Sequence, residues 1–220
     1  MKNYFFLILL FASLFFSKFS FSQDYSFSFT AGYGVNKLMS EIKSNPSGSG
    51  GMGFYFNPIN ALDVGFNFDM GSFNGKDKTY IYKTTTGVQF STPFYDYGFK
   101  AKYNLYSLIN HDIYSKYAFY VTTGIGFIEF RDRLEDLNGN FLEGFGYDNA
   151  GGAKPKTTTE LYIPFGLGFK YKFEKYYSLS FEPTFTWCNT GKLDYIKDNN
   201  KKDYYFYFPL IFEYKLYTKK

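Results

Sequence analysis

Cysteine, histidine and tryptophan each occur once in this chain of 220 residues. A single cysteine, Cys188, excludes an internal disulfide, so the fold must be stabilised in another way. The only histidine, His111, has no serine or cysteine nucleophile beside it. A Ser-His-Asp hydrolase needs its base held against the nucleophile. We therefore predict that the protein is not an enzyme and that His111 is a solvated turn residue.

Long apolar runs are also scarce, and the one that stands out lies near the start. Tyr4 to Phe16 follows Lys2 and precedes the small residues Ser20 and Ser22. This layout is typical of a secretory signal, and the run is too short for a membrane-spanning helix. We predict a signal peptide over residues 1–22 and one mature domain over 23–220. No cysteine follows the predicted cleavage site, which argues against a lipoprotein.

Charge of one sign is not in strong excess, because the formal net charge is only +4. This balance favours neither a nucleic-acid partner nor a polybasic membrane surface. The aromatic residues near the end of the chain, Tyr204 to Phe208, alternate like a strand and lack a basic groove for stacked bases. The sequence carries no motif for a cofactor, and we expect none.

What the chain does have is aromatic residues, with 30 Phe and 24 Tyr in a sequence whose mean hydropathy is only −0.30. Such a chain must separate its apolar and polar side chains, and strand alternation does this. Between Thr159 and Phe173 seven apolar residues alternate with polar or small ones, which excludes a helix. Similar alternation predicts eight strands: residues 25–34, 51–57, 62–71, 96–105, 117–127, 159–173, 179–187 and 206–216.

The connections between these segments alternate in length. The long ones cover 35–49, 74–93, 131–157 and 191–203, and the short ones cover 57–61, 106–116 and 174–177. Long loops on one side and short turns on the other are typical of outer-membrane barrels, whose short turns are periplasmic. We predict an all-β fold, an eight-stranded antiparallel up-and-down transmembrane β-barrel with both termini on the periplasmic side.

The polar face of the strands is small and carries charges of both signs at mid-strand, which suits a narrow lumen. The predicted lumen charges are Asp63, Asp69, Lys100, Lys102, Lys170, Glu182, Glu213 and Lys215. Tyrosines near strand ends resemble interfacial girdles. A soluble ligand-binding barrel would have the opposite arrangement, with its apolar face inside.

Three details of the wall can also be predicted. Pairing Lys172 with Ser180 across the turn at 174–177 would place Lys170 opposite Glu182. Cys188 falls on the polar face as an inert lumen residue. Three prolines within predicted strands each remove a ladder hydrogen bond, so local bulges are expected there: Pro164, Pro183 and Pro209.

Three features together resemble the outer-membrane β-barrel (PorT-like) family of Bacteroidota: the leader ending at Ser22 and Gln23, the stretch Leu161 to Phe173, and Thr122 to Phe127 before a charged loop. More loosely, the chain is similar to OmpA/OmpX-type eight-stranded barrels. The resemblance covers nearly all of the mature chain and implies location and fold. One departure is the end of the chain, where Tyr217 is followed by Thr218, Lys219 and Lys220 instead of closing on an aromatic residue.

The expected function is a non-enzymatic, monomeric barrel in outer-membrane lipid that meets an extracellular ligand or protein through loop 131–157. A small pore or a soluble lipid-binding barrel is the alternative. The loop holds oxygen-bearing side chains that partly match a calcium loop: Asp132, Glu135, Asp136, Asn138, Asn140 and Glu143. It lacks the required Gly and final Glu, so a turn at Asn138 and Gly139 is the simpler interpretation, and we expect no resident metal.

Overall fold

The structure is a computed structural model that describes residues 25–59, 61–105, 115–148, 151–152, 154, 157–195 and 202–217. The predicted signal peptide and His111 lie outside the described residues. Among those residues, no helix is both long and apolar enough to cross a membrane.

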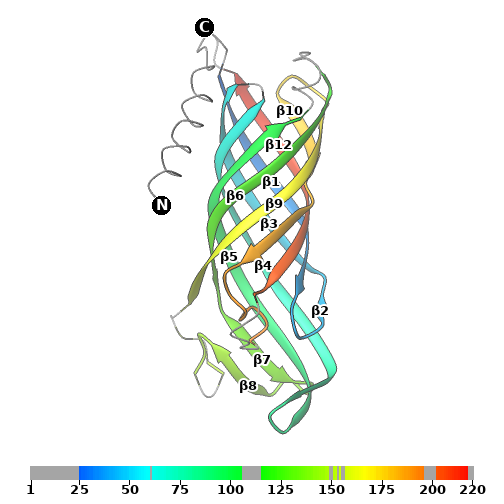
Figure 1. Cartoon of the computed structure of the whole chain (residues 1–220), viewed down its shortest axis with the longest axis vertical. Coiled ribbons are helices and arrows are strands. Elements are labelled where there is room, and N and C mark those ends of the chain that lie inside the picture. The colour runs from blue at the N-terminus through cyan, green and yellow to red at the C-terminus, as the bar shows by residue number, and fades with distance from the viewer. Residues whose placement is uncertain are drawn as a thin grey trace, which may run out of the picture.

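Eight antiparallel strands close into a ring (Figure 1). In order they are β1 (Ser26–Met39), β3 (Ser47–Ile59), β4 (Leu62–Tyr82), β5 (Thr85–Asn104), β6 (Tyr117–Phe130), β9 (Thr158–Lys172), a strand broken into β10 (Tyr177–Phe181) and β11 (Thr184–Cys188), and β12 (Tyr204–Tyr217). The last strand pairs with the first, Ser26 opposite Tyr217. Closure gives each strand a partner on both sides, which confirms the predicted barrel.

The apolar face of the wall points outward. Phe29, Ile125 and Leu167 are half-exposed or more, whereas Ser28, Thr122 and Lys102 on the other face are buried. The outward side chains form an apolar belt around the barrel. A soluble barrel that holds a lipid inside would need its apolar side chains to point inward. The observed faces contradict that alternative.

The wall continues well beyond the belt at the end opposite the pair Ser26 and Tyr217 (Figure 1). There β4 and β5 extend as a long hairpin, and β7 (Asp132–Asp136) pairs with β5 and with β8 (Phe141–Phe145). The short β2 (Ser44–Asn45) pairs with β4. We call this extension the crown; it comprises residues 36–47, 72–94, 128–148 and 189–195.

The crown corrects the prediction of long loops at 35–49 and 74–93, because much of both ranges is strand. On β5 the buried residues Val88, Phe90 and Phe94 face inward, while Ser91 and Pro93 are exposed. The alternation is intact but inverted relative to the belt. A wall with water outside needs polar side chains outside and apolar ones inside, so its composition resembled that of a loop.

The interior therefore has two layers. Charged and hydroxyl side chains fill the part surrounded by the belt. In the crown and at its junction with the barrel, an apolar cluster fills the interior: Leu38, Ile42, Phe73, Val88, Phe90, Phe94, Ile128, Phe130, Leu134, Tyr162, Cys188, Leu193, Tyr205 and Tyr207. Leu193, from the connection after β11, is fully buried in this cluster. Cys188 is fully buried on the inward face, as predicted.

Two details of the wall were predicted wrongly. Lys170 lies opposite Ser180, not Glu182, because the turn is tighter than expected and the amide of Glu174 bonds to the carbonyl of Tyr177 at 3.3 Å. The prolines do not produce bulges, because the pairing on both sides of Pro164 keeps the same register. Pro183 separates β10 from β11, and both halves keep one register with β12. Pro209 stays paired with Gly34 in an unshifted ladder.

Candidate functional site: lumen and crown

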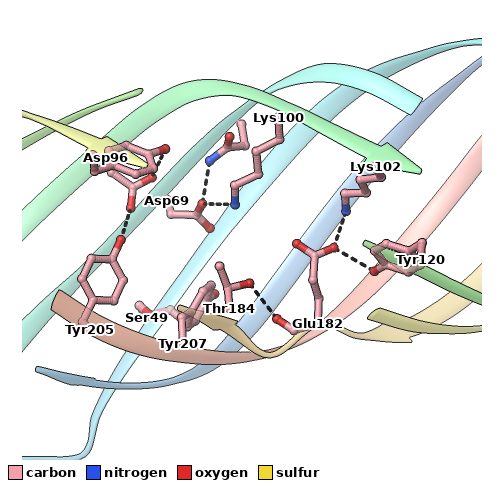
Figure 2. Close-up of polar contacts among 12 residues, drawn as sticks. Ser49, Asp69, Asp96, Lys100, Lys102, Tyr120, Glu182, Thr184, Tyr205 and Tyr207 are labelled. Carbon is pink, nitrogen blue, oxygen red and sulfur yellow. Dashed lines mark hydrogen bonds and ion pairs between the residues drawn. The ribbon is translucent and has the colours of Figure 1, made fainter. Parts of the chain in front are cut away.

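A buried ion pair lies at the centre of the lumen. The Lys102 ammonium is 2.7 Å from a carboxylate oxygen of Glu182, and the side chains are only 6% and 2% exposed. The hydroxyl of Tyr120 donates to the same oxygen at 2.7 Å (Figure 2). The ammonium also lies 4.7 Å from the centre of the Tyr55 ring. Ion pair, hydrogen bond and cation–π contact together compensate the burial of both charges.

Two further groups extend this network toward either end. Lys170 is 2.6 Å from Glu213 and 3.6 Å from Asp63, in the half nearer the termini. Lys100 is 3.8 Å from Asp69 in the half nearer the crown (Figure 2). Seven of the eight predicted lumen residues take part in these ion pairs. The eighth, Lys215, lines the cavity between the Lys170 and Lys102 groups.

The sequence interpretation missed a second polar group, built around Asp96. The hydroxyls of Tyr162 and Tyr205 donate to the two oxygens of its carboxylate at 3.2 and 3.3 Å (Figure 2). Asp96 was placed on the inward face but was left out of the charge network. The inward tyrosines were harder to recognise, because tyrosine also fits the outward belt. Only the odd or even position of a tyrosine along its strand distinguishes a place in the lumen from a place in the outward belt.

The lumen is filled rather than open. Among the described residues, its two best-formed cavities measure about 40 and 30 Å³. One ordered water occupies about 10–15 Å³ on this scale, so each cavity holds a few waters at most. On the crown side of these cavities, the rings of Phe73 and Phe94 stack with their centroids 4.5 Å apart, and the centroid of the Tyr205 ring lies 5.0 Å from that of Phe73. An aromatic layer thus separates the polar lumen from the crown mouth.

Within the crown, Glu143 on β8 joins three segments. It pairs with Lys83 and accepts hydrogen bonds from the hydroxyls of Tyr82 at 2.8 Å and Tyr195 at 2.6 Å. The bonds from Lys83, Tyr195 and Tyr82 lower the pKa of Glu143 to about 2. The ring of Phe145 packs 5.2 Å from Tyr195. These contacts hold the β7–β8 hairpin against the β4–β5 hairpin and the connection after β11.

The oxygen ligands of loop 131–157 do not gather into a calcium loop. Asp136 accepts bonds from the backbone amides of Asn138 and Asn140, both at 2.8 Å. Gly139 has a φ of 87°, which confirms the simple turn at Asn138 and Gly139. The other acids separate, since Glu135 bonds Arg133, Glu143 bonds Lys83, and Asp132 points into the crown.

No family model and no curated protein sequence matches the chain. Among solved structures, it is similar to Neisserial surface protein A, with a TM-score of 0.50 and 17% identity over 86% of this chain and 97% of that one. Ail, the attachment invasion locus protein of Yersinia pestis, matches with a TM-score of 0.47 and 9% identity over 88% of this chain and 100% of that one. A major outer membrane protein from Thermus thermophilus matches at 0.46 and 12% over 88% and 100%.

At 17% identity, the likeness to Neisserial surface protein A shows the fold alone. The chain is an eight-stranded antiparallel barrel of the outer-membrane protein type. The finer resemblance to the PorT-like family stays a prediction.

Proposed function

We propose that the protein is a non-enzymatic barrel of a bacterial outer membrane whose crown binds an extracellular partner. The observation that carries the proposal is the crown: an extension of the wall with an apolar core that continues beyond the belt and ends in partly exposed aromatic rings. A barrel that served only as a membrane anchor would not need it.

The belt supports the membrane part of the proposal. Its residues cover the outside of the ring with Phe, Leu, Ile and Met side chains, a surface that a bilayer solvates and water does not. The predicted leader would export the chain, and PorT-like membership fits the same location. In this placement the crown faces outward and the termini face the periplasm.

The crown surface supports the binding part. The guanidinium of Arg133 lies 5.6 Å from the centre of the Phe141 ring and 5.8 Å from that of Tyr147. All three side chains are partly exposed. Arginine and aromatic residues are enriched in the energetic centres of interfaces, because they combine large contact area with directional bonding. We infer that this face of the β7–β8 hairpin meets the partner.

A transport role is less well supported, because the lumen is filled by ion pairs and closed by aromatic rings. The lumen network is best explained as the barrel's stabilising core. Its carboxylates contact lysines or tyrosine hydroxyls.

Two measurements test the proposal. An epitope inserted near Gly151 should be accessible to antibody on intact cells, whereas one inserted at Lys175, in the β9–β10 turn, should be accessible only after lysis. The reverse pattern would overturn the orientation. In planar bilayers the protein should give no steady conductance, and a stable open channel would refute the closed lumen.

The binding role is tested with a panel of immobilised proteins and oligosaccharides. Any partner of the crown should lose binding to the variant Arg133→Ala/Tyr147→Ala but keep binding to Lys175→Ala at the opposite end. Equal binding by both variants would contradict recognition through the β7–β8 hairpin.

A further inference from the structure

Three carboxylates meet at the mouth of the crown from segments far apart in the sequence. Glu41 follows β1, Asp194 follows β11, and Asp203 directly precedes β12. Ligand oxygens of all three lie within 4.8 Å of one another. Asp194 and Asp203 are only 0% and 2% exposed, so water does not screen their charges. Such a group of buried like charges is unfavourable unless a cation or protons neutralise it.

Hydrogen bonds from the backbone hold two of the carboxylates in place. The amide of Leu193 donates to Asp203 at 2.7 Å, and the amide of Ile42 donates to Asp194 at 3.1 Å. The carbonyl of Leu193 in turn accepts a bond from the hydroxyl of Thr92 at 2.7 Å. The carboxylates are thus positioned by the wall and do not depend on flexible side chains alone.

A fourth carboxylate supplies an independent observation. Asp132, at the start of β7, is 0% exposed and shares the inward face with Phe130 and Leu134. One of its oxygens accepts a bond from the amide of Phe145 at 2.7 Å. The other is buried and has no hydrogen-bond partner among the described residues. The charge of Asp132 contributes, after burial, Asp194 and Glu41, to raising the pKa of Asp203, so Asp132 lies near the three-carboxylate group.

We infer that Glu41, Asp194 and Asp203 form a binding site for one divalent cation, with the buried carboxylate of Asp132 beside it, and that calcium is the ion it fits. The donors are all oxygens, which suit hard cations and not zinc or copper. Calcium bonds oxygens at about 2.4 Å and can bridge ligands up to about 4.8 Å apart without moving them. Magnesium bonds at about 2.1 Å and would require the carboxylates to move closer.

The ion would join the connections after β1, after β11 and before β12. Leu193, whose amide donates to Asp203, is fully buried beside this group. Calcium would therefore hold these three connections of the crown together. The proposed binding face on the β7–β8 hairpin plays no part in this inference.

The test uses the full mature chain folded in detergent micelles, with calcium binding measured by calorimetry. We expect one calcium per chain, and at least a roughly tenfold loss of affinity in Asp194→Asn and in Asp203→Asn, because ligand charge sets affinity. Glu174→Gln, an exposed acid in the β9–β10 turn, should bind as the parent does. No binding by the parent chain, or parental affinity in both aspartate variants, would overturn the site. Equally tight binding of magnesium would overturn the assignment to calcium.

Thermal unfolding separates ligation from simple misfolding. With the metal chelated, Asp203→Asn should be at least as stable as the parent, since it removes like-charge repulsion. After calcium is added, the parent should gain in Tm and the variant should not. A variant that gained as much as the parent would contradict a role for Asp203 as a ligand.

Discussion

Replacing Leu167 by arginine should destabilise the barrel in a bilayer far more than the same change at Ile81, although both side chains are similarly exposed. Leu167 is 63% exposed at the middle of the apolar stretch of β9, and Ile81 is 66% exposed at the far end of β4. An arginine at the bilayer midplane costs about 2–4 kcal/mol, and one at or beyond the interface costs about 0–1 kcal/mol. The difference between the two variants should therefore be about 2–3 kcal/mol.

The assay is reversible urea unfolding in lipid vesicles. The fluorescence of the single tryptophan, Trp187 on β11, reports the transition. Leu167→Phe serves as the matched control, because it keeps an apolar side chain in lipid and should be nearly neutral. Equal losses for Leu167→Arg and Ile81→Arg would refute the placement of the membrane boundary between the belt and the crown.

Three further outcomes follow from the interior. A double-mutant cycle on Lys102→Met and Glu182→Gln should show a coupling energy above about 1 kcal/mol, since breaking a buried ion pair costs about 3–5 kcal/mol. A larger coupling energy between Lys170 and Glu182 would contradict the observed strand register. Phe73→Ala should cost about 3–5 kcal/mol by opening a cavity in the crown, and a loss below 1 kcal/mol in urea unfolding would contradict its packing. Burial, then Asp194, Glu41 and Asp132, raise the pKa of Asp203 from 3.8 to about 8, with Cys188 and Lys192 also near this group. Between pH 5 and pH 8, Asp203 binds a proton in the calcium-free folded chain but not in the unfolded chain, so the free energy of unfolding should fall as the pH rises. The fall should be smaller in Asp203→Asn. A free energy of unfolding that rises over this range would contradict the assignment.

The sequence predicted well which face of the barrel wall each side chain occupies, a property that we call strand parity. A side chain's face depends only on odd or even position along its own strand. Phe212 outward and Glu213 inward therefore required no knowledge of the neighbouring strands. The same parity placed Lys102 and Glu182 in one lumen, where they form an ion pair that was not itself foreseen.

Register was harder, because it depends on two strands and the turn between them. Shifting β9 against β10 by two residues leaves every side chain on its original face, so alternation cannot detect the error. The expected contact between Lys170 and Glu182 failed for this reason. Lys170 on β9 reaches Glu213 on β12 past the intervening strand β10, and Glu182 reaches Lys102 across the lumen. Only closure of all eight strands determines these partners.

The crown was missed because polar composition was taken to mark the end of a strand. Along β5 the alternation never stops, since Phe90 and Phe94 keep the parity of Asp96 and Lys100. What changes near Tyr95 is which parity is apolar: outward on the side toward Asn104, and inward on the side toward Thr85. A strand whose backbone pairing is unbroken can exchange its apolar face only if the medium outside changes. An inversion of parity without a break in period therefore marks the place where the wall leaves lipid and enters water.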